Sequence, residues 1–160
     1  MNFNPILIVS GEPNSIFLEI FFKTQKKYKA INPIILISSK KLLIMQMQKL
    51  KFKKKIKLLD PSRLKKYKLN NKTINLINVE YEQIHAFEKI TNISNKFIEN
   101  SFKLAFEIIK KYKISKFING PISKKSFLNK KYMYVNLQQR SFGLPYNNSF
   151  ALKISYKKDK

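Results

Sequence analysis

Two of the three glycines in this chain occupy the same sequence context, at the end of an apolar run and directly before or near a proline. Gly11 follows the apolar run 6–9, and Gly120 follows the run 114–118. A glycine at such a turn permits a positive φ or a close approach of the backbone to a ligand. In open α/β sheets, ligands usually bind where strands end and helices begin. The pattern predicts a ligand cleft, although two ordinary strand-to-helix turns would give the same pattern. The predicted cleft residues are Gly11, Glu12, Pro13, Asn119, Gly120 and Pro121.

Three ionisable side chains could add chemistry to these turns. Lys124 would lie in the first turn of a following helix, where it could face a phosphate or carboxylate or project into solvent beside Lys125. Glu12 could accept hydrogen bonds from the next helix or face the cleft. His85 is the only histidine and has no recognisable ligand spacing to the nearby glutamates, so we expect it on the surface. Without a second histidine, a cysteine or paired aspartates, the chain holds no complete catalytic set and no metal site.

The charge of the chain is strongly positive, with a formal value of +24 over 160 residues. Nearly all of this charge is lysine, whereas arginine is the better residue for bidentate phosphate and base contacts. The lysines are also spread along the sequence, so we expect no specific nucleic-acid partner, and only weak, salt-sensitive binding to RNA. Neither a signal peptide nor a transmembrane run is present, and cysteine is absent. These features suit a cytoplasmic protein without a membrane partner.

Apolar runs and helical periodicity alternate along the chain and predict the elements that position these residues. The expected strands are 6–9, 33–39, 53–59, 73–79, 114–119 and 150–156. The expected helices are 15–27, 40–50, 92–111 and one that starts at 123–128. In the first helix, Ile16 and Ile20 are expected on the apolar side with Phe17 and Phe21 beside them, and Ser15 is the expected N-cap. In the third helix, Ser94 or Asn92 is the expected N-cap. The apolar stripe of the third helix is expected to hold Ile93, Phe97, Phe102, Ala105, Phe106 and Ile109.

Near-continuous apolar strands in alternation with helices predict a three-layer α/β fold with a mostly parallel sheet. We expect one partial α/β domain over residues 1–160, the N-terminal portion of a two-domain protein. From Met133 onward the periodic pattern degrades, and 133–160 is expected to be a divergent or degraded end. Because the chain stops directly after an expected strand, it looks truncated.

Two motifs resemble those of the 4-hydroxythreonine-4-phosphate dehydrogenases, enzymes of pyridoxal phosphate biosynthesis. Ser10-Gly11-Glu12-Pro13 with Glu19 resembles the family's amino-terminal GEP/GDP-A-G-I-G-P-E motif. The segment Asn119–Lys124 resembles the family's T-G/A-P-x-x-K turn, which follows a long helix and a strand. The order and spacing of the motifs agree over residues 5–131.

The chain also departs from the family pattern. Residues Asn14–Leu18 lack both later glycines of the first motif, and Tyr134–Leu137 do not match the family's G-H/x-T-E segment. The family enzymes are considerably longer, and their metal-binding histidines lie beyond the point where this chain ends. The resemblance implies an isocitrate/isopropylmalate dehydrogenase-like fold and a homodimer with its site in the interdomain cleft. It further implies NAD, a divalent metal and a phosphorylated small-molecule substrate that is oxidised and then decarboxylated.

The chain alone is therefore expected not to turn over. A basic RNA-associated protein and a non-catalytic α/β module that binds an anion at Gly11 and Gly120 remain alternatives.

Overall fold

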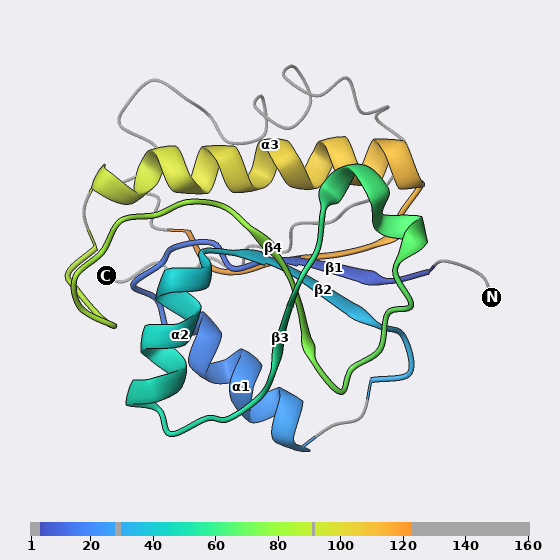
Figure 1. Cartoon of the computed structure of the whole chain (residues 1–160). Coiled ribbons are helices and arrows are strands. Elements are labelled where there is room, and N and C mark those ends of the chain that lie inside the picture. Colours follow the sequence, from blue (N-terminus) through green and yellow to red (C-terminus); the bar gives the residue numbers. More distant parts are fainter. Residues whose placement is uncertain (1–3, 28–29, 91, 123–160) are drawn as a thin grey trace, which may run out of the picture. The chain divides into compact units, whose positions relative to one another are not determined.

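Figure 1 shows the computed structural model of the chain, which describes residues 4–27, 30–90 and 92–122. These residues belong to one compact unit that extends over Met1–Asn129. Lys124, the helix expected at 123–128, the strand expected at 150–156 and the divergent end at 133–160 lie outside the described residues.

Five apolar runs form one parallel sheet, as the sequence predicts. The strands are β1 (Ile6–Val9), β2 (Ile34–Ser38), β3 (Ile56–Leu58), β4 (Ile74–Asn78) and β5 (Lys116–Asn119). Their order across the sheet is β3-β4-β2-β1-β5. In the register, Leu7 of β1 lies opposite Ile35 of β2 on one side and Phe117 of β5 on the other. Strands buried on both faces need apolar residues in succession, which explains the continuous runs. β3 is shorter than the predicted 53–59.

Helices cover both faces of the sheet and make three layers. Figure 1 shows α1 (Phe17–Lys27) and α2 (Lys40–Lys49) on one face and α3 (Asn95–Tyr112) on the other. The 3-10 turns η1 (Pro61–Lys66) and η2 (Asn92–Ser94) complete the described elements. α1 and α2 carry the chain toward the β3 edge, whereas α3 carries it back past β2 and β1 to β5. Because such crossovers are right-handed, opposite directions of travel put the helices on opposite faces.

The buried face of α1 differs in part from the predicted one, since Phe21 is buried as predicted but the two isoleucines are not. Ile16 and Ile20 are 65% and 51% exposed, and the buried residues of the helix are Leu18, Phe21 and Phe22. The pairs 16/20 and 18/22 have the same four-residue spacing, so periodicity does not choose between them. Packing against the rest of the fold decides which pair is buried, because Phe22 stacks on Phe52 with 4.6 Å between the ring centroids. Ser15 does act at the start of this helix, where its hydroxyl oxygen accepts from the Phe17 N–H at 3.3 Å.

α3 begins at Asn95, after η2, rather than at the predicted Asn92. The predicted stripe is buried except for Ile93, which lies in η2 and is 76% exposed. Ser94 occupies the N-cap position, but its side chain makes no capping hydrogen bond. The predicted capping role of the Ser94 hydroxyl is therefore wrong, because that hydroxyl bonds to Glu12 instead. Among the described residues, no helix combines the length and the apolar character needed to cross a membrane.

Candidate functional site

The turn after β1 and the turn after β5 lie side by side at the carboxyl edge of the sheet. Val9 is opposite Asn119 in the register of β1 and β5. The Gly120 N–H donates to the carbonyl of Val9 at 2.7 Å, and the Glu12 N–H donates to the carbonyl of Pro121 at 2.8 Å. The structure thus brings both predicted glycine turns together, at the edge where open α/β sheets bind ligands.

Each of the two glycines is required by the backbone of the other turn. Gly11 has a φ of +71°, and a Cβ built there would lie 2.4 Å from the carbonyl oxygen of Pro121. A Cβ on Gly120 would lie 2.0 Å from the carbonyl oxygen of Ser10. Both distances are far below van der Waals contact, so the two turns pack this closely only with glycine at both positions. At both glycines the close approach is therefore to protein backbone.

Glu12 is a buried carboxyl, 2% exposed, in the turn after β1. Its Oε2 accepts a hydrogen bond of 3.0 Å from the Ser94 hydroxyl, and the Asn14 N–H also bonds to the carboxyl. Its Oε1 has no hydrogen-bond partner within the described part of the chain. Burial raises the pKa of Glu12 above its ordinary value of 4.5, and the bonds from Ser94 and Asn14 oppose part of that rise. One oxygen therefore serves local structure, while the other is buried without a hydrogen-bond partner among the described residues.

Two buried glutamine side chains fix the position of this turn. Gln46 of α2 is fully buried, and its Nε2 donates to the carbonyls of Pro13 at 3.0 Å and Ala86 at 2.9 Å. Gln83 follows β4, and its Nε2 donates to Oδ1 of Asn14 at 3.0 Å. The turn after β1 is thus tied both to α2 and to the segment after β4.

Tyr81 connects the turn after β1 with α3. Its ring is buried and lies 5.1 Å from the ring of Phe97, measured between centroids. Burial raises the pKa of the Tyr81 phenol, the negative charges of Glu12 and Glu88 raise it further, and a hydrogen bond with Asn14 opposes the rise. Tyr81 therefore remains a neutral phenol that can donate a hydrogen bond at physiological pH.

Several buried polar atoms around these turns have no hydrogen-bond partner within the described residues. They are Ser10 Oγ, Glu12 Oε1, Ser38 Oγ, Gln46 Oε1 and Gln83 Oε1. Their residues come from the ends of β1 and β2, from α2 and from the segment after β4. Because buried polar atoms in native proteins nearly always have a partner, such a cluster indicates a place for a polar ligand or ordered water. The glutamine oxygens only accept hydrogen bonds, so a ligand with hydroxyl or ammonium groups would match them.

Sequence reasoning predicted the two turns but missed Gln46, Gln83 and Ser94. Gln46 had a readable signal, because it is a polar residue on the buried side of α2 between Leu43 and Met47. Gln83 lies in an irregular segment, where no periodicity separates a buried polar side chain from an exposed one. Ser94 stands at the N-cap position of α3, which predicts a capping bond rather than a bond to Glu12. Of the other predicted cleft residues, Pro13 is buried, Asn119 is partly buried and Pro121 is exposed. The Asn119 amide donates to the carbonyl of Gly120 at 3.1 Å.

The described residues do not fit the divalent metal that the resemblance implies. No group of three or more histidine, cysteine, aspartate or glutamate side chains in the described part could hold a metal ion. His85, the only histidine of the sequence, is exposed in the segment after β4, as expected.

Solved structures share this fold, although no protein-family model and no curated protein sequence matches the chain. A 4-hydroxythreonine-4-phosphate dehydrogenase from Burkholderia phymatum matches with a TM-score of 0.72 and 19% identity, over 91% of this chain and 45% of its own. The chain has the fold of part of a 4-hydroxythreonine-4-phosphate dehydrogenase. The 4-hydroxythreonine-4-phosphate dehydrogenase of Klebsiella pneumoniae matches with a TM-score of 0.67 and 13% identity, over 85% of this chain and 43% of its own.

These matches confirm, at the level of the fold, the resemblance seen in the sequence motifs. The chain spans less than half the length of either 4-hydroxythreonine-4-phosphate dehydrogenase. At such low identity the shared property is the path of the backbone, and it does not extend to individual side chains.

Proposed function

We propose that this chain supplies one wall of a 4-hydroxythreonine-4-phosphate dehydrogenase-type site, built on the carboxyl edge of its sheet. The observation that carries the proposal is the buried carboxyl of Glu12, with one unpartnered oxygen, between two turns that occur in the fold of such dehydrogenases. The substrate class is a phosphorylated amino acid with a free hydroxyl group. Its oxidation would use NAD and would be followed by loss of carbon dioxide.

The proposed roles of the residues follow from their chemistry. Glu12 Oε1 would accept a hydrogen bond from the substrate's ammonium or hydroxyl group, aided by the side-chain oxygens of Gln46 and Gln83. Tyr81, as a neutral phenol, would donate to a substrate oxygen. Lys124, which the sequence places shortly after Gly120, would attract the phosphate.

The proposal gives this chain a binding role and leaves the redox step to residues outside it. NAD would accept the hydride, and no group of side chains among the described residues would hold the metal. The proposal assigns the metal ligands to another polypeptide, because a second copy of the described residues would add only the same side chains. A cytoplasmic location belongs to the same proposal.

Calorimetric titration of the full chain with 4-phosphohydroxy-L-threonine tests this function. We expect saturable binding that weakens about tenfold in Glu12→Gln, because the charge next to the ligand's ammonium is removed. Glu99→Gln removes the same charge from the exposed side of α3 and should leave the affinity unchanged. Equal losses in both variants, or no binding by the wild type, would overturn the proposal.

Absorbance of NADH in the same mixture separates a binding role from a complete enzyme. With NAD and a divalent metal added, we expect no NAD reduction by the chain alone. Turnover that a chelator abolishes would contradict the proposed need for another polypeptide.

The charge of +24 favours a second candidate, a basic RNA-associated protein or a simple anion-binding module. Such a function predicts RNA binding that survives about 0.2 M salt, whereas incidental attraction by lysines falls steeply with salt. Filter binding of a mixed-sequence RNA over a salt series distinguishes salt-resistant RNA binding from incidental attraction by the lysines.

A further inference from the structure

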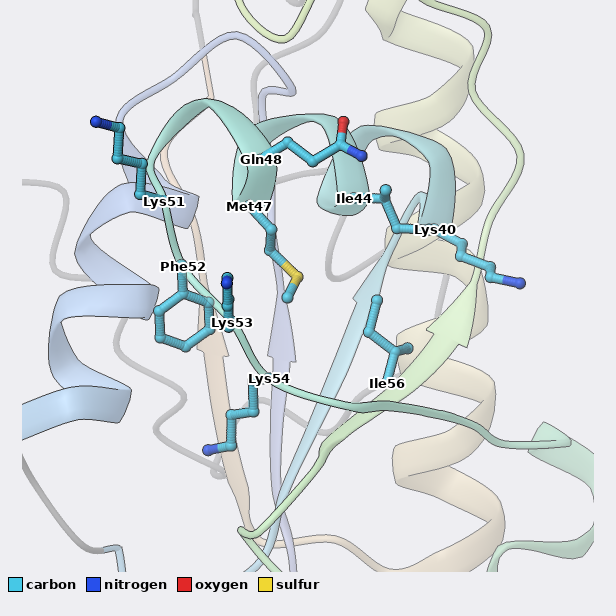
Figure 2. Close-up of a pocket in the computed structure, with 9 residues that line it drawn as sticks. All are labelled: Lys40, Ile44, Met47, Gln48, Lys51, Phe52, Lys53, Lys54 and Ile56. Carbon is cyan, nitrogen blue, oxygen red and sulfur yellow. The ribbon is translucent and has the colours of Figure 1, made fainter.

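A hollow of 930 Å³ lies between α2 and the chain that leads into β3, away from the glycine turns (Figure 2). Its apolar lining consists of Ile44, Met47, Phe52 and Ile56, and its lysines are Lys40, Lys51, Lys53 and Lys54. Figure 2 shows Met47 and Ile56 projecting into the hollow from opposite walls, with the lysine ammonium groups around the rim. The hollow therefore has an apolar centre and a positively charged border.

The order of the strands explains why this face is open. β3 is the edge strand of the sheet, and α2 is the helix that crosses to it over β4. No third helix follows α2 on this face within the described residues, so no described helix covers the apolar side chains next to β3. Ile44 is 36% exposed, although it lies on the same helix as the buried core residues Leu43 and Met47.

The end of α2 builds one wall of the hollow with a recurrent C-cap. The Lys51 N–H donates to the carbonyl of Gln48 at 3.2 Å, and the Phe52 N–H donates to that of Met47 at 2.8 Å. This pair of bonds is the Schellman pattern, with Lys51 in the left-handed region at a φ of 50°. The motif brings the two apolar side chains at its ends, Met47 and Phe52, to the same hollow. Backbone hydrogen bonds therefore fix the shape of this wall of the hollow.

The charge around the hollow is of one sign. Every charged residue between positions 40 and 56 is a lysine. Lys41 pairs with Glu82 at 2.5 Å, and Lys54 donates to Oε1 of Gln25 at 2.5 Å. For the rim lysines Lys40, Lys51 and Lys53, no acidic side chain in the described part of the chain forms an ion pair. The rim thus attracts negative charge from outside.

We propose that this hollow, called here the α2–β3 groove, is the docking site for an acidic amphipathic helix of another protein. The charge argues against residues 123–160 and against a second copy of this sequence as occupant, because Asp159 is the only acidic residue in 123–160 and a second copy would also carry +24. An apolar stripe on the partner covers Ile44, Met47 and Phe52, while its carboxylates face the rim lysines. α2 has 10 residues, about 15 Å of helix, so the partner contributes roughly three to four turns. This inference is independent of the proposed dehydrogenase function.

Fluorescence anisotropy with a labelled designed peptide tests the groove. The probe is a 14-residue helix former with leucines on one face and glutamates elsewhere, about four turns long. Its control is a scrambled peptide of the same composition, in which the leucines share no face. We expect the amphipathic peptide to bind the full chain at least about tenfold more tightly than the scrambled one, because only it can bury an apolar stripe.

Two matched double variants locate the binding. Lys51→Glu with Lys53→Glu reverses the charge of the rim, and Lys103→Glu with Lys110→Glu reverses the same number of charges on the exposed side of α3. We expect the first pair to weaken binding about tenfold or more and the second to change it less than about twofold. Circular dichroism verifies that both variants fold.

An apolar pair of variants completes the test. Ile44→Glu should abolish binding of the peptide, whereas Ile20→Glu, at an exposed isoleucine of α1, should not. Equal binding of the amphipathic and scrambled peptides, or equal losses in the two lysine variants, would reduce the effect to general attraction and overturn the proposal. Binding of dodecanoate but not of the peptide, with sensitivity to Ile44→Glu, would also overturn it in favour of a small amphiphile.

Discussion

The hydroxyl of Ser94 donates a 3.0 Å hydrogen bond to Oε2 of Glu12, across 82 positions of sequence. Both side chains are almost fully buried, at 1% and 2% exposure. Ser94 stands at the start of α3, and Glu12 stands in the turn after β1, so the bond joins the helix on one face to the carboxyl edge of the sheet. The start of α3 is also where its backbone dipole favours negative charge. The contact therefore favours the ionised form of Glu12 and opposes part of the rise in its pKa that burial causes.

The stability of the protein should fall with rising pH through the titration of Glu12. Its pKa is raised above 4.5 in the folded state, so the folded state holds the proton more tightly than the unfolded state. Below about pH 4.5 the neutral carboxyl makes its full contribution to the free energy of unfolding. This contribution is lost as the pH rises through the raised pKa of Glu12. We expect Glu12→Gln, which stays neutral, to gain stability relative to the wild type over that range.

Urea unfolding midpoints from about pH 4 to pH 8 measure the stability difference between Glu12→Gln and the wild type. Glu99→Gln, on the exposed side of α3, is the control for loss of one negative charge. A stability difference between Glu12→Gln and the wild type that does not vary with pH would show that Glu12 does not titrate as its burial implies.

Removal of the Ser94 hydroxyl should raise the pKa of Glu12 further, because the hydrogen bond from Ser94 lowers it. The carboxyl carbon chemical shift of Glu12, followed by NMR during a pH titration, measures this change in Ser94→Ala. Ser101→Ala is a close control, since Ser101 is also buried in α3 but donates to the carbonyl of Phe97 at 2.7 Å. Each variant should lose about 1 kcal/mol of stability, and only Ser94→Ala should shift the titration. An unchanged pKa in Ser94→Ala would mean that the hydrogen bond is absent in solution.

Alanine at Gly120 should destabilise the fold by about 3 kcal/mol, because its Cβ would lie 2.0 Å from the Ser10 carbonyl oxygen. Gly11→Ala should have a similar effect, since φ at this position is +71° and Pro121 blocks the space. Both substitutions separate the same two turns, so the double variant should lose less than the sum of the two. Urea unfolding measures all three, with the half-exposed Ile118→Ala of β5 as control. Full additivity would contradict a shared contact.

Glycine in place of Lys51 should stabilise the protein by about 1 kcal/mol, because the left-handed conformation at φ 50° is unfavourable for a residue with a Cβ. Lys49→Gly removes the same side chain two residues earlier, inside α2, and should destabilise by about 0.5–1 kcal/mol. Thermal unfolding of both variants tests the pair. A loss of stability in Lys51→Gly would mean that the lysine stem contributes more packing than its backbone conformation costs.

Asp60 should produce the opposite pH dependence to Glu12, at lower pH. Hydrogen bonds from Ser62 and Arg63 lower the pKa of Asp60 from 3.8 to about 2. A lowered folded-state pKa contributes stability above pH 3.8 that is lost as the pH falls toward about 2. Asp60→Asn should therefore be less stable than the wild type at neutral pH, and the two should converge in acid. Ser62→Ala, which removes one donor, should move the Asp60 titration upward in NMR.

The strands were predictable because continuous apolar runs leave little choice of environment. Ile6–Val9 and Ile34–Ser38 contain no polar residue before their ends, and such runs are buried in a parallel sheet. The face of a helix that is buried is harder to predict than the position of a strand. In α1 the stripe with Ile20 and the stripe with Phe22 are equally periodic, and only the stacking on Phe52 decides between them.

The candidate site was only partly predictable, because its contacts depend on how distant elements pack together. The sequence indicates that Gly11 and Gly120 end two strands, but the contact between them depends on β5 being placed beside β1. The pairing of Ser94 with Glu12 depends on the course of α3 as well. Helical periodicity suggested an N-cap for Ser94, and the tertiary structure redirected its hydroxyl to a carboxyl that local sequence does not reveal.

The position of β1 between β2 and β5 determines the order in which the chain can complete its sheet. β1 is the first described strand and pairs with β2, the next one along the chain, but its other neighbour is the last described strand. Until β5 is made, one edge of the apolar run Ile6–Val9 lacks its partner, and the turn at Gly11 lacks the backbone that packs on it. Exposed edges of this kind invite pairing with other chains, and long-range parallel pairing is slow. A nascent chain of this protein would therefore depend on shielding of its first strand until β5 has formed.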